Sequence, residues 1–138
     1  MPKKQRGRWD FDHANDIKEI VVDLVGKLGF DHIKTAQLFC VRSSNSVTRA
    51  YARIWGLSRI FQVTAGYSPT YVIEVLSQHF DKLSEEEKKK VLIHELLHIP
   101  KTFSGALLSH RGRYHRVDHR TVDELYKKFI MIPKRRLW

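Results

Sequence analysis

Two histidines and a glutamate stand at the spacing that a metal-dependent hydrolase requires. The segment reads His94-Glu95-Leu96-Leu97-His98, an H-E-x-x-H motif. On a helix, His94 and His98 lie one turn apart on the same face, so both imidazoles can hold one metal ion. Glu95 stands between them, where a carboxylate can take a proton from an activated water. The motif therefore predicts a zinc-dependent hydrolase, and a peptidase before other hydrolases.

The residues around the motif favour a helix. Ser84 and Glu87 have the spacing of a capping box, and Glu85–Glu87 suit the positive end of a helix dipole. Pro100 predicts the end of the helix. The apolar side chains opposite the motif are expected in the core: Leu92, Ile93, Leu96, Leu97 and Ile99. The alternative is a surface helix on which the two histidines are incidental polar residues.

A catalytic zinc normally has three protein ligands, so one more is needed. The candidates after Pro100 are His110, His115, His119, Asp118, Asp123 and Glu124. His110 is preferred because Pro100 and Gly105 allow the loop before it to turn back. The metzincin spacing is absent, since Lys101 and Ser104 occupy the positions of its glycine and third histidine.

The motif and the stretch His110-Arg111-Gly112-Arg113-Tyr114 resemble the SprT-like zinc metallopeptidases, whose motif helix is followed by His-Gly-x-x-aromatic. This chain has one additional residue, Arg111, before the glycine. Residues 52–57 and 71–104 are more similar to a metallopeptidase family found in archaea and phages. The resemblance spans roughly residues 50–128. It implies a zincin-like fold and one zinc ion.

The expected elements make an α+β domain. A helix is predicted over residues 14–28, strands over 33–42, 50–55, 59–64 and 70–76, then the motif helix, an irregular segment over 101–109, and a helix from Thr121 to about Ile132. The predicted architecture is a small zincin-like domain with an N-terminal helix, a three- to four-stranded, mostly antiparallel sheet, the motif helix and a C-terminal helix. Strand 70–76 is expected either to receive an extended peptide at its edge or to be a buried core strand.

Length and composition define the remaining expectations. The 138 residues predict one metallopeptidase domain, 14–132, between basic tails at 1–13 and 133–138. Cys40 is the only cysteine, so no internal disulfide can form, and it is expected in the core. No run is apolar enough for a membrane span or a signal peptide. A cytoplasmic protein without a membrane partner is therefore expected.

The net charge of +10 is concentrated at the two ends, and only +3 remains between them. The tails contain Lys3, Lys4, Arg6, Arg8, Lys134, Arg135 and Arg136, while Arg111 and Arg113 follow the expected third ligand. These cations could bind DNA through its phosphates, or could be solubilising residues without a partner.

Two functions follow from these patterns. The first is a zinc metallopeptidase that acts on proteins or peptides, including those associated with nucleic acids, with Glu95 as its catalytic base. The second is a nucleic-acid-binding protein whose zinc site is structural. Glu95 separates the two, because a structural site fills all four metal positions with ligands and leaves that carboxylate without a role.

Overall fold

The computed structural model describes residues 10–110 and 117–133. The elements are β1 (Asp10–His13), α1 (Asn15–Lys27), the 3₁₀ turn η1 (Thr35–Gln37), β2 (Leu38–Ser44), β3 (Ala52–Gly56), α2 (Arg59–Ala65), β4 (Tyr71–Leu76), α3 (Ser77–Phe80), α4 (Glu85–Leu96) and α5 (His119–Met131). The predicted α+β class is confirmed. No helix among these residues is long and apolar enough to cross a lipid bilayer.

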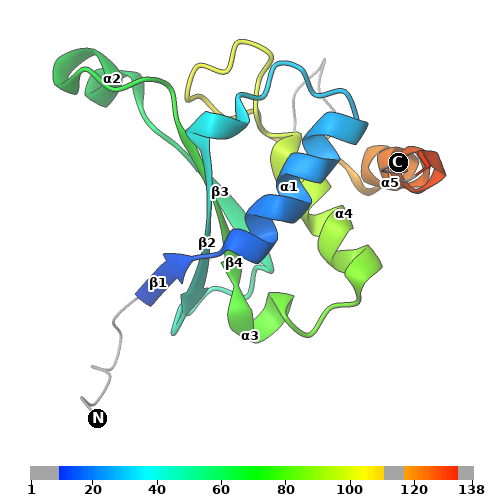
Figure 1. The fold of residues 1–138 in the computed structure, drawn as a ribbon. Helices are drawn as coiled ribbons and strands as arrows, with labels where there is room; N and C mark the ends of the chain where they lie inside the picture. The colour runs from blue at the N-terminus through cyan, green and yellow to red at the C-terminus, as the bar shows by residue number, and fades with distance from the viewer. Residues whose placement is uncertain (1–9, 111–116, 134–138) are drawn as a thin grey trace, which may run out of the picture.

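The four strands form one mixed sheet in the order β1-β2-β4-β3. β2 and β4 are parallel, and the other two pairings are antiparallel, as a mostly antiparallel sheet requires. Helices α1, α4 and α5 lie on one side of the sheet, and α2 extends beyond its end (Figure 1). In this order β4 is a central strand and β3 is an edge strand.

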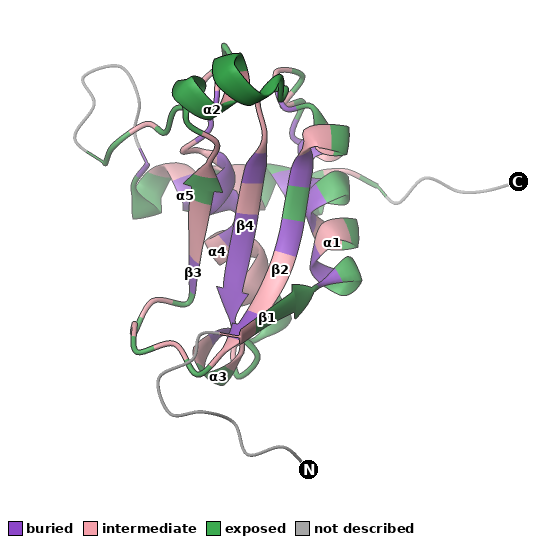
Figure 2. Ribbon diagram, turned by 90° about the vertical axis from the view of Figure 1, so that its left-hand side faces the viewer, coloured by how far each residue is buried: buried purple, intermediate pink, exposed green. Residues whose placement is uncertain are grey.

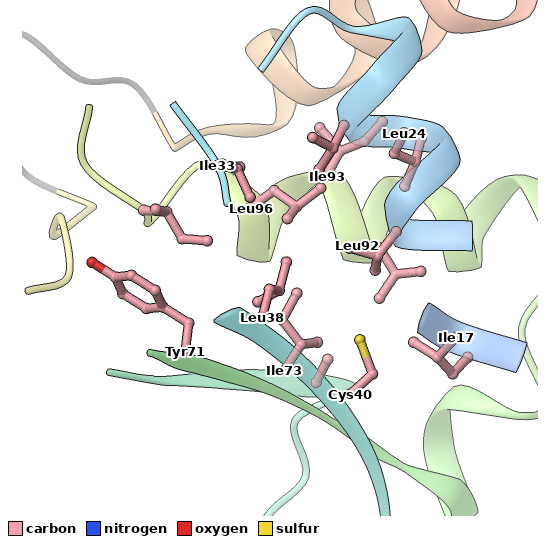
Figure 3. Packing of buried hydrophobic residues seen from close by; sticks show 14 of the residues in the cluster. Ile17, Leu24, Ile33, Leu38, Cys40, Tyr71, Ile73, Leu92, Ile93 and Leu96 are labelled. Atoms are coloured by element: carbon pink, nitrogen blue, oxygen red, sulfur yellow. The ribbon is translucent and has the colours of Figure 1, made fainter. Parts of the chain in front are cut away.

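The core lies between the sheet and the helices α1 and α4. Alternate residues of the strands, such as Leu38 and Ile73, point towards Leu24 of α1 and Leu92 of α4 (Figure 3). All four side chains are fully buried. Cys40 belongs to this core as expected, and burial raises the pKa of its thiol to about 11. The helix that carries the metal motif is therefore anchored by its apolar side.

Among the described residues, no helix covers the other face of the sheet (Figure 2). Its centre holds the fully buried carboxylate of Glu74, which accepts hydrogen bonds from Arg53 Nε at 2.5 Å and Trp55 Nε1 at 2.9 Å. Burial raises the pKa of Glu74, but the hydrogen bonds from Arg53 and Trp55 oppose this effect and bring the pKa below its ordinary value. These contacts tie the edge strand β3 to the central strand β4.

Several predicted elements need correction. Residues 59–64 form helix α2 instead of a strand; none of its side chains is buried, so its apolar residues are not in a sheet. β1 pairs with β2 although the sequence placed it in the basic tail. Helix α5 begins at His119 and not at Thr121, because Asp118 caps it by accepting from the Thr121 amide at 2.9 Å. Strand β4 cannot receive a peptide at its edge, since both its edges are paired.

Candidate metal centre

Helix α4 carries His94 and Glu95, the first two residues of the motif. Its start is fixed as predicted, because the Ser84 hydroxyl accepts from the Glu87 amide at 3.1 Å. The apolar side of the helix is fully buried at Leu92 and Ile93, which sets the rotation of the helix about its axis. His94 is half-buried and Glu95 is only 7 % exposed.

His98 lies just beyond the last helical residue, Leu96. Its amide donates to the Glu95 carbonyl at 3.1 Å, an i to i−3 bond that tightens the final turn. Two hydrogen bonds to Leu108 hold His98 in place. Ring Nδ1 donates to the Leu108 carbonyl at 2.5 Å, and the Leu108 amide donates to the His98 backbone carbonyl at 2.8 Å. Since Nδ1 carries the proton, the Nε2 lone pair is the one available to a metal.

The loop after His98 turns back and returns His110 to the motif. The fully buried Tyr71 hydroxyl accepts from the Gly105 amide and donates to the Ala106 carbonyl, each at 2.8 Å. The Gln62 side-chain amide donates to the Ser104 carbonyl at 2.8 Å. Gly105 adopts a φ of +95°, which favours glycine, as the predicted turn requires.

The three histidines converge on one point. His94, His98 and His110 each offer a ring nitrogen, and these nitrogens all lie within 4.8 Å of one another. Nε2 of His98 is 3.4 Å from Nε2 of His110. Two nitrogens bound to one tetrahedral zinc at about 2.0–2.1 Å would be about 3.3–3.4 Å apart. The donor set and spacing therefore fit a metal ion with three imidazole ligands.

Electrostatics keep these ligands in the form that binds metal. Burial, with the neighbouring His98, His110 and His119, lowers the pKa of His94 to about 4. Burial also lowers the pKa of His98, and the neighbouring His110 adds to this effect. Both rings are therefore neutral at neutral pH, as metal ligands must be. Burial raises the pKa of Glu95 to about 8, so without a metal this carboxyl holds its proton at neutral pH, and a cation bound by the adjacent imidazoles would favour its ionised form.

The other candidate ligands lie elsewhere or have other partners. His119 lines a pocket beside His94 but is not part of the cluster, Asp118 caps α5, and Asp123 is 3.1 Å from Lys90 Nζ. Glu124 is 3.3 Å from Arg120 Nε. His115 and the proposed nucleic-acid contacts, which are Lys3, Lys4, Arg6, Arg8, Arg111, Arg113, Lys134, Arg135 and Arg136, lie outside the described residues.

A groove leads to the three histidines. It has a volume of about 600 Å³ and lies between Ala52–Ile54 of β3 on one side and His94, Glu95 and His98 on the other, with residues 107–110 at its end. A second hollow of about 310 Å³ adjoins it on the far side of His94 and Glu95. His119 and Val122 of α5 line this hollow. The sequence did not single out the edge strand β3 or this position of His119, since both depend on strand order and helix packing.

Comparison with known proteins gives one match. The model of a protein family described as "Putative phage metallopeptidase" matches residues 9–130. No curated protein and no solved structure matches the chain. The matched segment contains all three clustered histidines and Glu95.

Proposed function

The chain belongs to this metallopeptidase family, and we propose that it hydrolyses peptide bonds with one zinc ion held by His94, His98 and His110. The single observation that carries the proposal is the buried Glu95 carboxyl beside three converging imidazoles, at the head of a groove. Within the described part of the chain the cluster has three candidate ligands, which would leave a fourth position open, as is typical of catalytic zinc and not of structural zinc.

The roles of the residues follow from this arrangement. A zinc ion held by His94, His98 and His110 would supply Lewis acidity, which would polarise the scissile carbonyl and make a water molecule acidic enough to react near neutral pH. Glu95 takes the proton of the attacking water and then delivers it to the leaving amine. His98 is kept in the correct tautomer by the Leu108 carbonyl.

The edge strand β3 offers a place for the substrate backbone. Within the described part of the chain no strand pairs with its outer side, and Ala52–Ile54 line the groove. An extended peptide can add there as a further strand, which brings its backbone along the histidines. This assigns to β3 the role that the sequence considered for residues 70–76.

His119 supplies a hydrogen-bond donor near His94 and Glu95. It lines the 310 Å³ hollow together with His94 and Glu95. We assign it the stabilisation of the oxyanion that forms when the water attacks the carbonyl. Tyr71 is not available for this role, because it is buried and its hydroxyl is hydrogen-bonded to the backbone of residues 105 and 106. Val91 and Val122 of the same hollow can contact an apolar side chain next to the scissile bond, while Lys90 and Asp123 form a charged part of its lining.

The proposal is tested by Glu95→Gln, which keeps the size of the side chain and removes its basicity. We expect unchanged zinc content by elemental analysis and a loss of peptide cleavage of about 10²-fold or more. The matched control is Glu19→Gln, an exposed glutamate on α1, which should cleave as the unaltered protein does. Full activity of Glu95→Gln would remove Glu95 from the mechanism. An unaltered protein that binds zinc but cleaves no peptide would instead support the structural zinc site of a nucleic-acid-binding protein.

A further inference from the structure

A third concave surface lies on the opposite face of the sheet from the core helices. It has a volume of about 660 Å³, and we call it the aromatic pocket. Its lining includes the rings of Phe39, Trp55 and Tyr67 and the polar side chains of Gln37, Ser68 and Thr70. The proposed peptidase reaction uses none of these side chains.

The strand register explains the shape of the pocket. Phe39 of β2 and Trp55 of β3 are both direct neighbours of Val72 on the central strand β4. The three side chains therefore form one row across the sheet, with a short side chain between two aromatic ones. Phe39 and Trp55 are each 44 % exposed, and Tyr67 is 63 % exposed. Rigid strands thus present flat rings to a ligand, with the smaller Val72 as a floor.

Polar groups lie beside these rings. The Thr70 hydroxyl is 3.2 Å from Oε1 of Gln37 and 2.9 Å from the Ser68 carbonyl. An amide and two hydroxyls next to these aromatic rings can bind the polar edge of a flat heterocycle while the rings contact its faces.

The charge around the pocket favours an anionic ligand. All residues that line it fall between positions 37 and 72, and no aspartate or glutamate occurs from position 32 to 73. The same stretch contains five cations, Lys34, Arg42, Arg49, Arg53 and Arg59. The next acid, Glu74, is fully buried and paired with Arg53. Arg42 is engaged by Asp16 and Asp81, so Lys34, Arg49 and Arg59 are the cations of this stretch that we assign to a phosphate backbone.

We propose that the aromatic pocket binds an unpaired base of a single-stranded nucleic acid. Stacking on exposed rings beside cations is the common way in which proteins hold single strands without strict sequence preference. Strand β3 contributes Trp55 to this pocket and Ala52–Ile54 to the groove, so the two sites share one strand. Binding of a base in the aromatic pocket requires neither zinc nor Glu95, so it can be tested separately from the peptidase activity.

The test measures binding of the full-length protein to a fluorescein-labelled twelve-nucleotide oligothymidine by fluorescence anisotropy. We expect Phe39→Ala and Tyr67→Ala each to weaken binding about 5- to 100-fold, the range found for loss of one stacked base. Tyr67→Phe keeps the ring and should bind as the unaltered protein does. Met131→Ala removes an exposed apolar side chain on α5 and should leave the affinity unchanged.

Two further measurements separate this site from the other anionic partners. The affinity for a duplex of the same length should change little in Phe39→Ala and Tyr67→Ala, because the bases of a duplex are already stacked on one another. Vesicles of phosphatidylglycerol test a membrane surface, to which the exposed Ile60, Phe61 and Val63 of α2 could contribute. The proposal is overturned if the unaltered protein does not bind the oligonucleotide. It is equally overturned if Phe39→Ala and Tyr67→Ala both bind the oligonucleotide with the affinity of the unaltered protein. The same holds if these variants lose binding to vesicles but not to the oligonucleotide. Cleavage of a short peptide by the same variants reports on the peptidase separately.

Discussion

At the scale of single residues, the protein controls protonation through burial and one backbone carbonyl. Burial lowers the pKa of His94 to about 4 and raises that of Glu95 to about 8. The Leu108 carbonyl directs the proton of His98 to Nδ1. The same low-polarity surroundings therefore keep the two imidazoles neutral and keep the Glu95 carboxyl protonated at neutral pH until a bound cation favours its ionised form.

Replacing the third histidine tests the ligand set. His110→Ala should lower the affinity for zinc by about 100-fold or more, because removal of a partner of a ligand alone costs 10- to 100-fold. The measurement is a competition titration with a zinc chelator. His13→Ala, an exposed histidine on β1, is the control and should bind zinc normally. Normal zinc affinity in His110→Ala would point to His115 as the third ligand.

The raised pKa of Glu95 predicts a pH-dependent stability when zinc is removed by a chelator. The native carboxyl keeps its proton up to a pH of about 8, whereas an ordinary carboxyl releases it near 4.5. Between these values Glu95 binds its proton in the native state but not in the unfolded chain, so its contribution to stability falls as the pH rises through this window. His94, whose pKa is lowered to about 4, has the opposite effect between pH 4 and 6.5, but it is present in both proteins and cancels in their difference. Glu95→Gln lacks this loss and should become more stable than the unaltered protein by up to a few kcal/mol at pH 8. Urea unfolding from pH 4 to 9 checks this, and parallel curves for the two proteins would contradict it.

At the scale of elements, the site depends on how the end of β3 packs against the loop that carries His110. A Cβ on Gly56 would lie 2.0 Å from the Gly105 carbonyl oxygen, and one on Gly105 would lie 2.2 Å from that of Leu57. The two segments approach each other closely because neither has a side chain at this point. Tyr71 and Gln62 hold the same loop by hydrogen bonds.

The close approach predicts opposite effects for two glycine substitutions. Gly56→Ala should destabilise the protein by about 2 kcal/mol or more, since backbone must move, and should also weaken zinc binding through His110. Gly26→Ala is the matched control: a Cβ there meets nothing within 4 Å in helix α1, and it should stabilise the protein by about 0.5–1 kcal/mol. Thermal unfolding and zinc titration measure both effects. Equal stability of the two variants would refute the close packing of β3 on the loop.

At the scale of the whole molecule, the charges are segregated along the chain. No acidic residue occurs from position 32 to 73 or from 96 to 117, while seven cations lie in residues 1–8 and 134–136. The face with the aromatic pocket and the loop with His110 belong to the acid-free stretches. A substrate associated with nucleic acid is therefore a reasonable extension of the proposed peptidase function.

Deleting residues 1–8 and 134–138 tests the contribution of the tails. DNA binding should weaken, and the slope of log affinity against log salt should fall by about 0.9 for each phosphate contact that is lost. Anisotropy titrations at several salt concentrations measure both quantities. Cleavage of a short uncharged peptide should not change. Unaltered DNA affinity would show that the tails are not the DNA contacts.

The sequence by itself determined the features that depend on local physics. Capping by Ser84, the stop at Gly29 with a φ of +67°, and the apolar side of α4 follow from side-chain chemistry within a few residues. The spacing of His94, Glu95 and His98 also predicts the chemistry without the fold. Residues 59–64 show the limit of such reasoning, because their apolar pattern does not reveal that no sheet is available to bury them.

Only the tertiary structure decided which distant parts meet. The return of His110 to His98 depends on contacts of the loop with Tyr71 and Gln62, which come from other elements. The strand order makes β3 the edge beside the groove and places Phe39 and Trp55 on either side of Val72. Such long-range pairings are fixed by packing of the whole chain, and a local residue pattern carries no information about them.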